Sequence, residues 1–362
     1  MDHRSPAAVD DAADRTPLAP PRAIAPTALG RSGRWRLADL ATWLPVLAVA
    51  AWAGARAFGL EGGTRPVQLM AFTPYVALAA LVPLAVALLR RRWLAAGIAI
   101  LATATLAIGV LPRSIPGATG FDPAPDGPTL RVMTSNVFAG KADAEALVGL
   151  IRRHQVDVLA VQELTAEGQR ALAGAGLDTL LPNQMVRPGL GAAGTGVYTR
   201  LTIRRGSPRP LAASGFVQTT VTVAVPGAPD IEVESTHPCA PYAAGKGTIW
   251  RSDLSQQPAA TPDGPLRVLL GDFNATLDHA LLRELIATGY HDAAAVAGKG
   301  LVPTWPNDGQ LIPGVTLDHV LADRRIGVRD VTIADVPGSD HRAVFAELVL
   351  PSILADARGN SG

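Results

Sequence analysis

Cysteine, lysine and charged residues in general are scarce in this sequence of 362 residues. The single cysteine, Cys239, excludes a disulfide framework and a cysteine-rich zinc site, and no disulfide-linked partner is expected. Charged residues make up only 17% of the chain, whereas soluble domains average about 25%. This composition indicates either a membrane-attached protein or a globular domain with a very apolar appendage.

The sequence also has little excess of one charge sign, with 32 Lys and Arg against 31 Asp and Glu. This balance excludes a strongly basic nucleic-acid-binding protein and an acidic disordered one. The balance changes along the chain: residues 1–129 hold 12 basic and 8 acidic residues, or +4, and residues 130–351 hold 19 and 22, or −3. Glycine (36) and proline (30) are frequent but have no period, which excludes a collagen-like repeat.

Long apolar runs are present, in contrast, in the N-terminal part of the chain. Leu37–Ala55 contains one charge, Asp39, and Val67–Leu89 and Trp93–Leu111 contain none. Since about 20 apolar residues in a helix cross the hydrocarbon core of a bilayer, we expect three transmembrane helices. The alternative is a buried helical hairpin in a soluble protein, which three adjacent arginines between the last two runs disfavour. The runs contain no His, Lys or Glu, so we expect an anchor rather than a transporter component.

Arginines flank these runs unevenly and predict an orientation. Three lie just before the first run (Arg31, Arg34 and Arg36), three between the second and third (Arg90, Arg91 and Arg92), and two between the first and second (Arg56 and Arg65). By the positive-inside rule, the N-terminus lies in the cytoplasm. After three crossings, the rest of the chain is expected to be extracytoplasmic, with the protein in the cell membrane.

The composition predicts five segments. Residues 1–33 and 352–362 are polar tails expected to be disordered, 34–111 form the anchor, 112–129 form a Pro/Gly linker long enough to hold a domain off the bilayer, and 130–351 form a folded domain. Within 130–351, apolar strands alternate with short amphipathic helices over 142–153 and 279–288. The expected strands cover 130–137, 157–163, 194–201, 216–225, 231–238, 266–274, 317–322 and 341–350. This alternation is typical of one α/β domain.

Polar side chains occur where these strands meet their loops. They are Asn136, Glu163, His237, Asp272 with Asn274, Asp318, and Asp340 with His341. A single such residue more often forms a turn, but six strand ends together favour a site, because strand ends are where binding crevices form in α/β sheets. Carboxylates suit Mg²⁺, and phosphoryl-transfer chemistry adds a base and cationic groups.

The motifs at these strand ends resemble those of the endonuclease/exonuclease/phosphatase superfamily, which has the DNase I-like fold. The motifs are SNV (135–137), QE (162–163), STHP (235–238), GDFN (271–274), LDHV (317–320) and SDH (339–341), in the family's order. GDFN and SDH together are the specific signal. The resemblance implies a four-layer α/β sandwich, with two mixed β-sheets flanked by helices, here preceded by three transmembrane helices.

The resemblance also implies roles for individual residues. Glu163 resembles the principal Mg²⁺ ligand, with Asn136 supporting the metal and phosphate region and Asp340 near the metal; Mn²⁺ is the alternative ion. Asp272 resembles the carboxylate that positions or deprotonates water, and Asn274 the amide that binds a phosphate oxygen. His341 resembles the histidine that stabilises charge or protonates, Asp318 its partner, and His237 an additional catalytic histidine of the secreted nuclease and sphingomyelinase branches.

Two departures from the family concern the substrate. Phe138 stands where the abasic-site endonuclease branch has an acidic metal ligand, and the basic DNA-gripping loops of that branch have no counterpart here. Arg251 is a candidate for a further phosphate contact or an ordinary surface arginine. Trp305 either rims the cleft, touches lipid or packs its loop.

The sequence therefore predicts a membrane-anchored, Mg²⁺-dependent phosphoric ester hydrolase. The first-ranked activity is that of a nuclease or general phosphodiesterase. The first alternative is an enzyme directed at phospholipid or sphingomyelin, because tethering to a bilayer raises the local concentration of such substrates. The alternative from another class is a catalytically silent membrane protein that uses the fold for binding. That alternative is disfavoured because the four carboxylates are all present.

Overall fold

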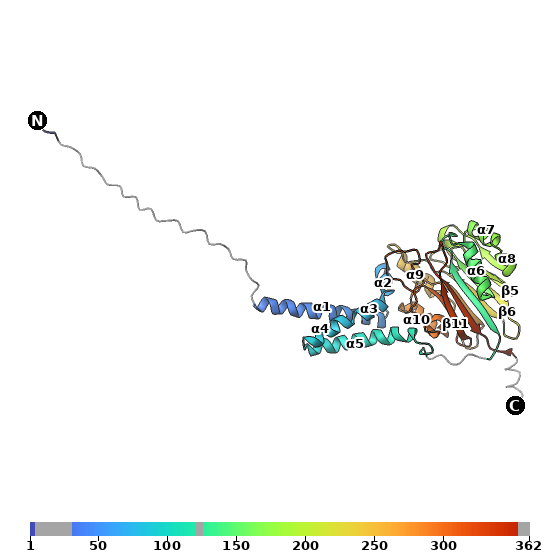
Figure 1. Cartoon of the computed structure of the whole chain (residues 1–362), viewed down its shortest axis with the longest axis horizontal. Coiled ribbons are helices and arrows are strands. Elements are labelled where there is room, and N and C mark those ends of the chain that lie inside the picture. Colours follow the sequence, from blue (N-terminus) through green and yellow to red (C-terminus); the bar gives the residue numbers. More distant parts are fainter. Residues whose placement is uncertain (4–30, 120–125, 354–362) are drawn as a thin grey trace, which may run out of the picture. The chain divides into compact units, whose positions relative to one another are not determined.

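The computed structural model describes residues 1–3, 31–119 and 126–353, and it divides the chain into two compact units, Met1–Ala41 and Thr42–Gly362. Figure 1 shows the chain coloured along the sequence, with some of its helices and strands labelled. Most of the predicted N-terminal tail, residues 120–125 of the predicted linker and nearly all of the predicted C-terminal tail lie outside the described residues.

The N-terminal helices are α1 (Arg31–Ala57), α2 (Thr64–Met70), α3 (Thr73–Ala79), α4 (Leu81–Leu89) and α5 (Trp93–Val110), followed by the 3-10 turn η1 (Leu111–Ser114). Two stretches, Asp39–Ala57 and Trp93–Ser114, are long and apolar enough to cross a membrane. The expected middle span is bent by 62° between Met70 and Thr73, where Pro74 opens the next helix. The described helices thus supply two candidate spans, or three if the bent pair counts as one.

The rest of the chain forms two six-stranded mixed sheets (Figure 1). One sheet has the order β11-β12-β1-β2-β4-β3 and the other β5-β6-β7-β8-β10-β9. The pairs β1–β2 and β7–β8 are parallel and the remaining pairs antiparallel. The strands are β1 (Thr129–Asn136), β2 (Val158–Gln162), β3 (Asn183–Arg187), β4 (Thr195–Thr199), β5 (Thr202–Pro210), β6 (Val217–Ala224), β7 (Ile231–Thr236), β8 (Leu266–Asp272), β9 (Tyr290–Asp292), β10 (Asp318–Asp323), β11 (Gly327–Ala334) and β12 (Ala343–Val349).

The two sheets pack face to face over a core of small and branched side chains, among them Val132, Val158, Val221 and Val268. Helices cover both outer faces. Leu147 and Leu172 pack on the first sheet, and Trp250 and Leu285 on the second. The helices are α6 (Ala144–His154), α7 (Ala166–Gly174) and α8 (Leu177–Leu180) on the first, α9 (Lys246–Ser255) and α10 (Ala280–Ala287) on the second, with η2 (Gly191–Ala193) and α11 (Ala293–Val296) in loops. The predicted four-layer α/β sandwich is confirmed.

The start of the predicted middle span and the segment after the last span contact this sandwich directly. Val67 of α2 packs in the same apolar cluster as Trp250, and Gln68 Nε2 donates to the carbonyl of Pro241 at 2.7 Å. Beyond α5, the Gly117 N–H donates to the Val296 carbonyl at 3.1 Å. The described start of the predicted linker therefore lies against the domain and does not extend away from it.

Candidate active site

Six strand ends meet at one end of the sandwich. The parallel pairs β1–β2 and β7–β8 each bring two carboxyl ends to the same edge, and β10 begins with Asp318 directly opposite Asp272, the last residue of β8. His341 lies just before β12, which is antiparallel to β1. The arrangement brings together the residues that the sequence places at these ends: Asn136, Glu163, His237, Asp272, Asn274, Asp318 and His341.

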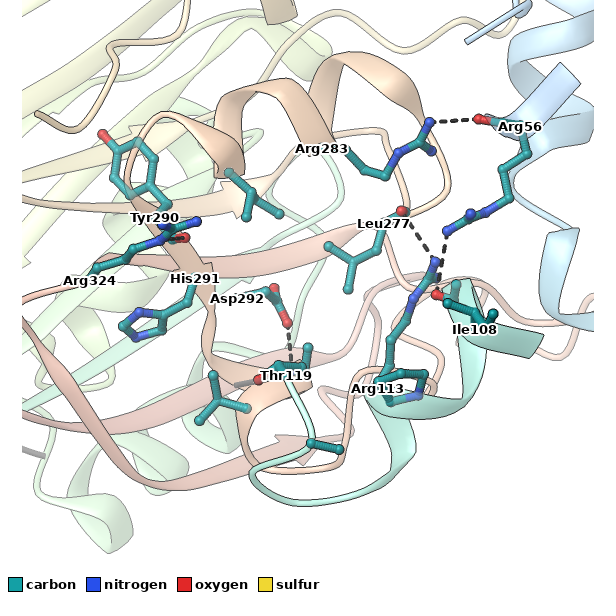
Figure 2. Close-up of a pocket in the computed structure, with 16 residues that line it drawn as sticks. Arg56, Ile108, Arg113, Thr119, Leu277, Arg283, Tyr290, His291, Asp292 and Arg324 are labelled. Atoms are coloured by element: carbon teal, nitrogen blue, oxygen red, sulfur yellow. Dashed lines mark hydrogen bonds between the residues drawn. The ribbon is translucent and has the colours of Figure 1, made fainter. Parts of the chain in front are cut away.

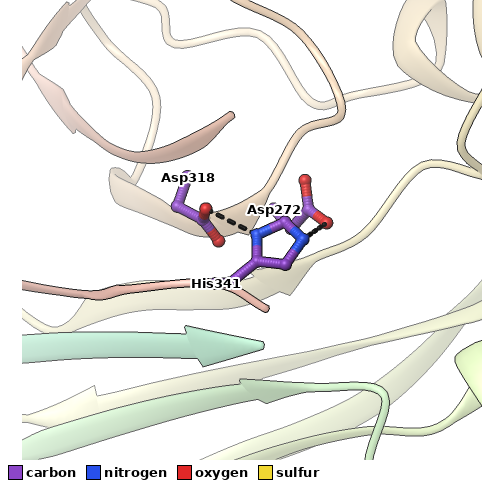
Figure 3. Close-up of side chains that lie close together, drawn as sticks. All are labelled: Asp272, Asp318 and His341. Carbon is purple, nitrogen blue, oxygen red and sulfur yellow. Dashed lines mark hydrogen bonds and ion pairs between the residues drawn. The ribbon is translucent and has the colours of Figure 1, made fainter. Parts of the chain in front are cut away.

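His341 lies between two carboxylates (Figure 3). Its Nδ1 is 2.8 Å from Asp318 Oδ2, and its Nε2 is 3.6 Å from Asp272 Oδ2. All three side chains are almost completely buried. The imidazole is therefore fixed in orientation, with a carboxylate facing each ring nitrogen.

The charges of this cluster are strongly coupled. Burial alone would lower the pKa of His341, but the Asp318 and Asp272 carboxylates outweigh it and raise that pKa to about 10. Burial, followed by the Asp318 carboxylate, raises the pKa of Asp272 above its usual range, although His341 and His237 oppose this shift. At neutral pH His341 is an imidazolium, and Asp272 is a more basic carboxylate than an exposed aspartate.

Asn136 connects this cluster to Glu163. Its Nδ2 donates to Glu163 Oε1 at 3.2 Å and to Asp272 Oδ2 at 3.1 Å, while its Oδ1 accepts from the Phe138 N–H at 2.9 Å. Glu163 Oε2 accepts from the Ala139 N–H at 2.9 Å. Asn136 therefore presents its amide nitrogen to the two carboxylates, which orients them.

His237 and Asn274 border Asp272 on the other sheet. His237 Nε2 is 3.6 Å from Asp272 Oδ2 and 4.0 Å from Glu163 Oε1. The Asn274 N–H donates to Asp272 Oδ1 at 2.8 Å, and its Nδ2 donates to the Pro238 carbonyl at 3.1 Å and to Asp272 Oδ2 at 3.4 Å. Asn274 in this arrangement positions Asp272, and its predicted phosphate contact stays a prediction.

Unusual backbone conformations gather at these residues. Phe138, Ala139, Glu163 and Asn274 have φ between 48° and 57°, the left-handed region that non-glycine residues seldom adopt. Such strain persists where the surrounding structure fixes it, and it is concentrated at functional sites. Here it directs Glu163 and Asn274 toward the ends of the two sheets.

Two sets of side chains could hold a divalent cation. The first is Asp272, Asp318 and His341, whose ligand atoms lie within 4.8 Å of one another. In this set, however, His341 Nδ1 is occupied by Asp318, which leaves Nε2 as the free ring nitrogen.

The second set is Glu163 and Asp340, whose carboxylates influence one another electrostatically. Asp340 Oδ2 accepts from Trp305 Nε1 at 3.2 Å, while its Oδ1 is buried without a hydrogen-bond partner among the described residues. Burial raises the pKa of Asp340; His341 and Trp305 lower it, and Glu163 raises it further, so the net shift is upward. A buried carboxylate oxygen without a partner is unfavourable, and a hard cation would satisfy it.

Two buried hydroxyls outside the predicted set of site residues also form hydrogen bonds that position the site. Thr304 Oγ1 accepts from the N–H groups of Leu317 and Asp318 at 2.9 and 3.1 Å. Ser339 Oγ donates to the Asn136 carbonyl at 2.7 Å and accepts from the His341 N–H at 3.1 Å. Ser339 begins the SDH motif and could have been found there, whereas Thr304 has no comparable signal.

The hydrogen bond of Arg251 lies outside the strand-end site. Its guanidinium donates to the Glu61 carbonyl at 2.7 Å, in the loop between α1 and α2. The structure thus does not bring Arg251 into hydrogen-bond contact with the other candidate residues, and its predicted role in substrate binding stays a prediction.

The sequence profile of the Endonuclease/Exonuclease/phosphatase family matches residues 133–341, more than half of the chain. The chain belongs to this family. Family membership supports hydrolysis of phosphoester bonds as its activity, and enzymes of the family commonly use divalent metals. A search of curated proteins found no match.

Solved structures show the same fold at low sequence identity. The chain is similar to D. rerio TDP2 humanized by 14 mutations, with 15% identity, a TM-score of 0.51, and coverage of 61% of this chain and 98% of the other. It is also similar to family proteins from Beutenbergia cavernae (22% identity, TM-score 0.48, coverage 62% and 72%) and Leptotrichia buccalis (19%, 0.46, 60% and 99%). At these identities the likeness concerns the fold alone.

Proposed function

We propose that this protein is a membrane-anchored, divalent-metal-dependent phosphodiesterase, acting as a nuclease or as a general phosphodiesterase. One observation carries the proposal: the buried imidazole of His341 lies between the carboxylates of Asp318 and Asp272, next to a carboxylate oxygen of Asp340 that has no hydrogen-bond partner among the described residues. A silent binding protein would have no need for so strained and so strongly charged an arrangement.

The residues of the site have distinct roles in this proposal. Asp272, whose pKa is raised, accepts the proton of the water that attacks phosphorus. His341 holds positive charge where negative charge develops on the phosphoryl oxygens, and Asp318 fixes its orientation and protonation. Asn136 and Asn274 position Asp272, and His237 adds a further donor beside it.

Glu163 and Asp340 are the proposed ligands of Mg²⁺, with Mn²⁺ as the alternative. When bound, the cation would neutralise charge on the phosphate and help to orient it. Asn136 supports this region by fixing the Glu163 carboxylate through its amide nitrogen.

The proposed location is the cell membrane, with the N-terminus in the cytoplasm and the catalytic domain outside it. Arginine placement supports this orientation. Contacts support it too, since the loop after α1 and the turn after α5 both lie against the catalytic domain, as two segments on one side of a bilayer would.

One observation favours a lipid head group as the alternative substrate. The loop from Trp305 to Gly314 bonds to Asp340 at one end, and at the other end the Gly314 carbonyl accepts from Tyr75 Oη of α3 at 2.7 Å. Leu311 and Ile312 of this loop are exposed. The rim of the site is thus tied to a helix of the proposed anchor and is apolar enough to touch a bilayer.

The test is hydrolysis of a soluble aryl phosphodiester, single-stranded DNA and sphingomyelin by the full chain in detergent, with and without EDTA. We expect metal-dependent hydrolysis of at least one substrate, and about a 10²–10⁴-fold lower kcat in Asp272→Asn and His341→Ala, the range for loss of an acid–base group. Asp330→Asn, at an exposed carboxylate of β11, is the matched control and should keep full activity. Equal rates in wild type and His341→Ala on every substrate would contradict the proposal.

A further inference from the structure

A cavity of about 730 Å³ lies where the ends of α1 and α5 meet the catalytic domain, away from the strand-end site. Figure 2 shows that Arg56, Arg113, Arg283 and Arg324 line it. Its remaining wall is largely apolar, with Ile108, Pro112, Leu277, Ile286 and Val296 among the lining residues. The cavity therefore combines concentrated positive charge with an apolar surface.

The acidic side chains beside the cavity do not match its arginines in number. Arg113 binds Asp278 through two nitrogens at 2.6 and 2.8 Å, and Arg56 Nε binds the same carboxylate at 2.6 Å. Arg283 donates to the backbone carbonyls of Asp278 and Arg56. The Asp278 carboxylate thus forms ion pairs with Arg113 and Arg56, whereas Arg283 has only carbonyl partners among the described residues.

Arg324 is the least compensated of the four. Its side chain is exposed to solvent; among the described residues it makes one long hydrogen bond, from Nε to the Tyr290 carbonyl at 3.4 Å, and no ion pair. Asp292, which also lines the cavity, is already bound to the imidazole of His319 at 2.8 Å. The terminal nitrogens of Arg324 are therefore available to a ligand.

The local electrostatics agree with an excess of positive charge. Burial lowers the pKa of Arg283, and the neighbouring Arg56 guanidinium lowers it further, although Glu61 and Asp278 act in the opposite direction. Partly buried guanidinium groups are stabilised by carboxylate or phosphate oxygens, which match their planar donors. The cavity thus favours an anion with several acceptor oxygens.

The position of the cavity indicates where that anion comes from. Ile108, on the last turns of α5, is 76% exposed and lies beside Gly109, whose carbonyl accepts from Arg56 at 3.4 Å. If α1 and α5 cross a membrane as proposed above, their ends lie at the depth of the lipid phosphates. An apolar wall that continues along α5 then suits acyl chains better than a freely soluble ion.

We propose that this cavity binds the phosphate group of an anionic membrane phospholipid, with Arg324 as the donor and the glycerol and acyl portion extending toward Ile108. The inference rests on the proposed membrane anchoring, but not on the proposed hydrolysis. The bound lipid would join the helices of the anchor to the catalytic domain at a site separate from the one that cleaves substrate.

The test measures binding in a chain that is expected not to hydrolyse lipid. The full-length His341→Ala protein in detergent is titrated with dioctanoyl phosphatidylglycerol, dioctanoyl phosphatidylcholine or inorganic phosphate, and its melting temperature is followed by tryptophan fluorescence. We expect phosphatidylglycerol to raise the melting temperature by about 5 °C at saturation, and the other two ligands to raise it by less than about half as much.

Adding Arg324→Gln should raise the lipid concentration for the half-maximal shift about tenfold, the usual effect of one lost charge-assisted contact. Arg204→Gln, at an exposed position of β5, makes the same change in net charge and should leave the titration unchanged. Arg324→Lys, a milder change should the glutamine variant not fold, is expected to keep part of the affinity. Identical titrations for the variants at 324 and 204, or an equal response to inorganic phosphate, would overturn the proposal. A chain that purifies without detergent would overturn the anchoring, whereas lost hydrolysis alone would leave this result intact.

Discussion

Adjacent residues of β10 build two histidine–aspartate pairs on opposite faces of one sheet, because successive side chains of a strand point to opposite sides. Asp318 faces the site and binds His341. His319 faces the other way, with Nδ1 2.8 Å from Asp292 and Nε2 2.8 Å from the Ala275 carbonyl. Burial alone would lower the pKa of His319, but Asp292 outweighs it and raises that pKa. Only the first pair can reach a substrate; the second joins β9 and β10 to the loop after β8.

The pKa of His291 is shifted downward, opposite to that of His319, and this shift leads to a prediction for stability. Burial lowers the pKa of His291 to about 4, despite the opposing effect of Asp292, whereas in the unfolded chain it is about 6.5. Between these values the unfolded state binds more protons than the folded state, so the free energy of unfolding decreases as pH falls from about 6.5 to 4. We expect His291 to account for about 2–3 kcal/mol of that decrease.

The measurement is the melting temperature of wild type and His291→Asn at pH 7.0 and pH 4.5. The variant should lose less stability between the two values than wild type does. His154→Asn serves as the control, because His154 lies at the end of α6 and is more exposed than His291; burial also lowers the pKa of His154. An equal pH response in wild type and His291→Asn would show that other groups cause the acid sensitivity.

At the residue scale, the sequence predicted which side chains gather but not how each is oriented. Strand ends and motif order are enough to bring Asn136, Glu163, Asp272 and His341 to one place, because parallel neighbours end at the same edge. Asn136 Oδ1 accepts a hydrogen bond from the Phe138 N–H, and this bond depends on the left-handed backbone conformation of Phe138. A phenylalanine at position 138 does not predict a left-handed conformation, so this orientation could not be derived from the sequence.

At the scale of elements, all eight strands expected from the sequence are present, and the four that it missed are the four sheet edges. β3, β5, β9 and β11 each pair on one side only. Central strands are buried on both faces and read as continuous apolar runs, whereas edge strands carry charge and proline, as in TIRRGSPRP of β5. Their pairing is set by tertiary contacts that a hydrophobic pattern does not contain.

The close approach of β7 and β8 depends on Gly271, which precedes Asp272. Its φ is 155°, and an added Cβ would overlap the carbonyl oxygen of Thr236. We therefore expect Gly271→Ala to separate the two strands at the site and to destabilise the fold by about 2–4 kcal/mol. Hydrolysis should fall at least about tenfold, since a displacement of Asp272 misplaces its oxygens.

The matched control is Gly149→Ala on α6, where nothing lies within 4 Å of the added Cβ. Alanine favours a helix interior over glycine by up to about 1 kcal/mol, so this variant should be slightly more stable and fully active. Melting temperature and kcat, measured together on both variants, separate the two expectations. A Gly271→Ala protein as active and as stable as wild type would contradict the role of this contact.

At the scale of the whole molecule, the sequence suggested a spacer between helices and domain, and the structure instead has contacts that join them. Arg113 lies inside the predicted linker and is buried, with its guanidinium on Asp278 of the catalytic domain. His279 Nε2 is 2.8 Å from the Val67 carbonyl of α2, and Glu61 accepts from the Ala280 N–H at 2.7 Å. These pairs are more than 150 positions apart in sequence, so composition alone could not predict them.

The carboxylate of Asp278 is the centre of this junction, which leads to a prediction about the coupling of helices and domain. It is completely buried; burial alone would raise its pKa, and Arg113 and Arg56 lower it below the usual range. Asp278→Asn would leave two buried guanidinium groups without their counter-charge, a change that typically costs about 3–5 kcal/mol.

We expect faster amide hydrogen exchange over residues 57–70 and 111–118 in the Asp278→Asn variant. Exchange in β1 and β8 should stay slow, and hydrolysis of a small soluble substrate should change less than about threefold, because none of the described hydrogen bonds of Asp278 reaches a residue of the strand-end site. Asp330→Asn, at a carboxylate that is 58% exposed, removes the same charge and should leave exchange unaltered. Unchanged protection of both segments in Asp278→Asn would mean that apolar packing around Val67, and not the ion pair, holds helices and domain together.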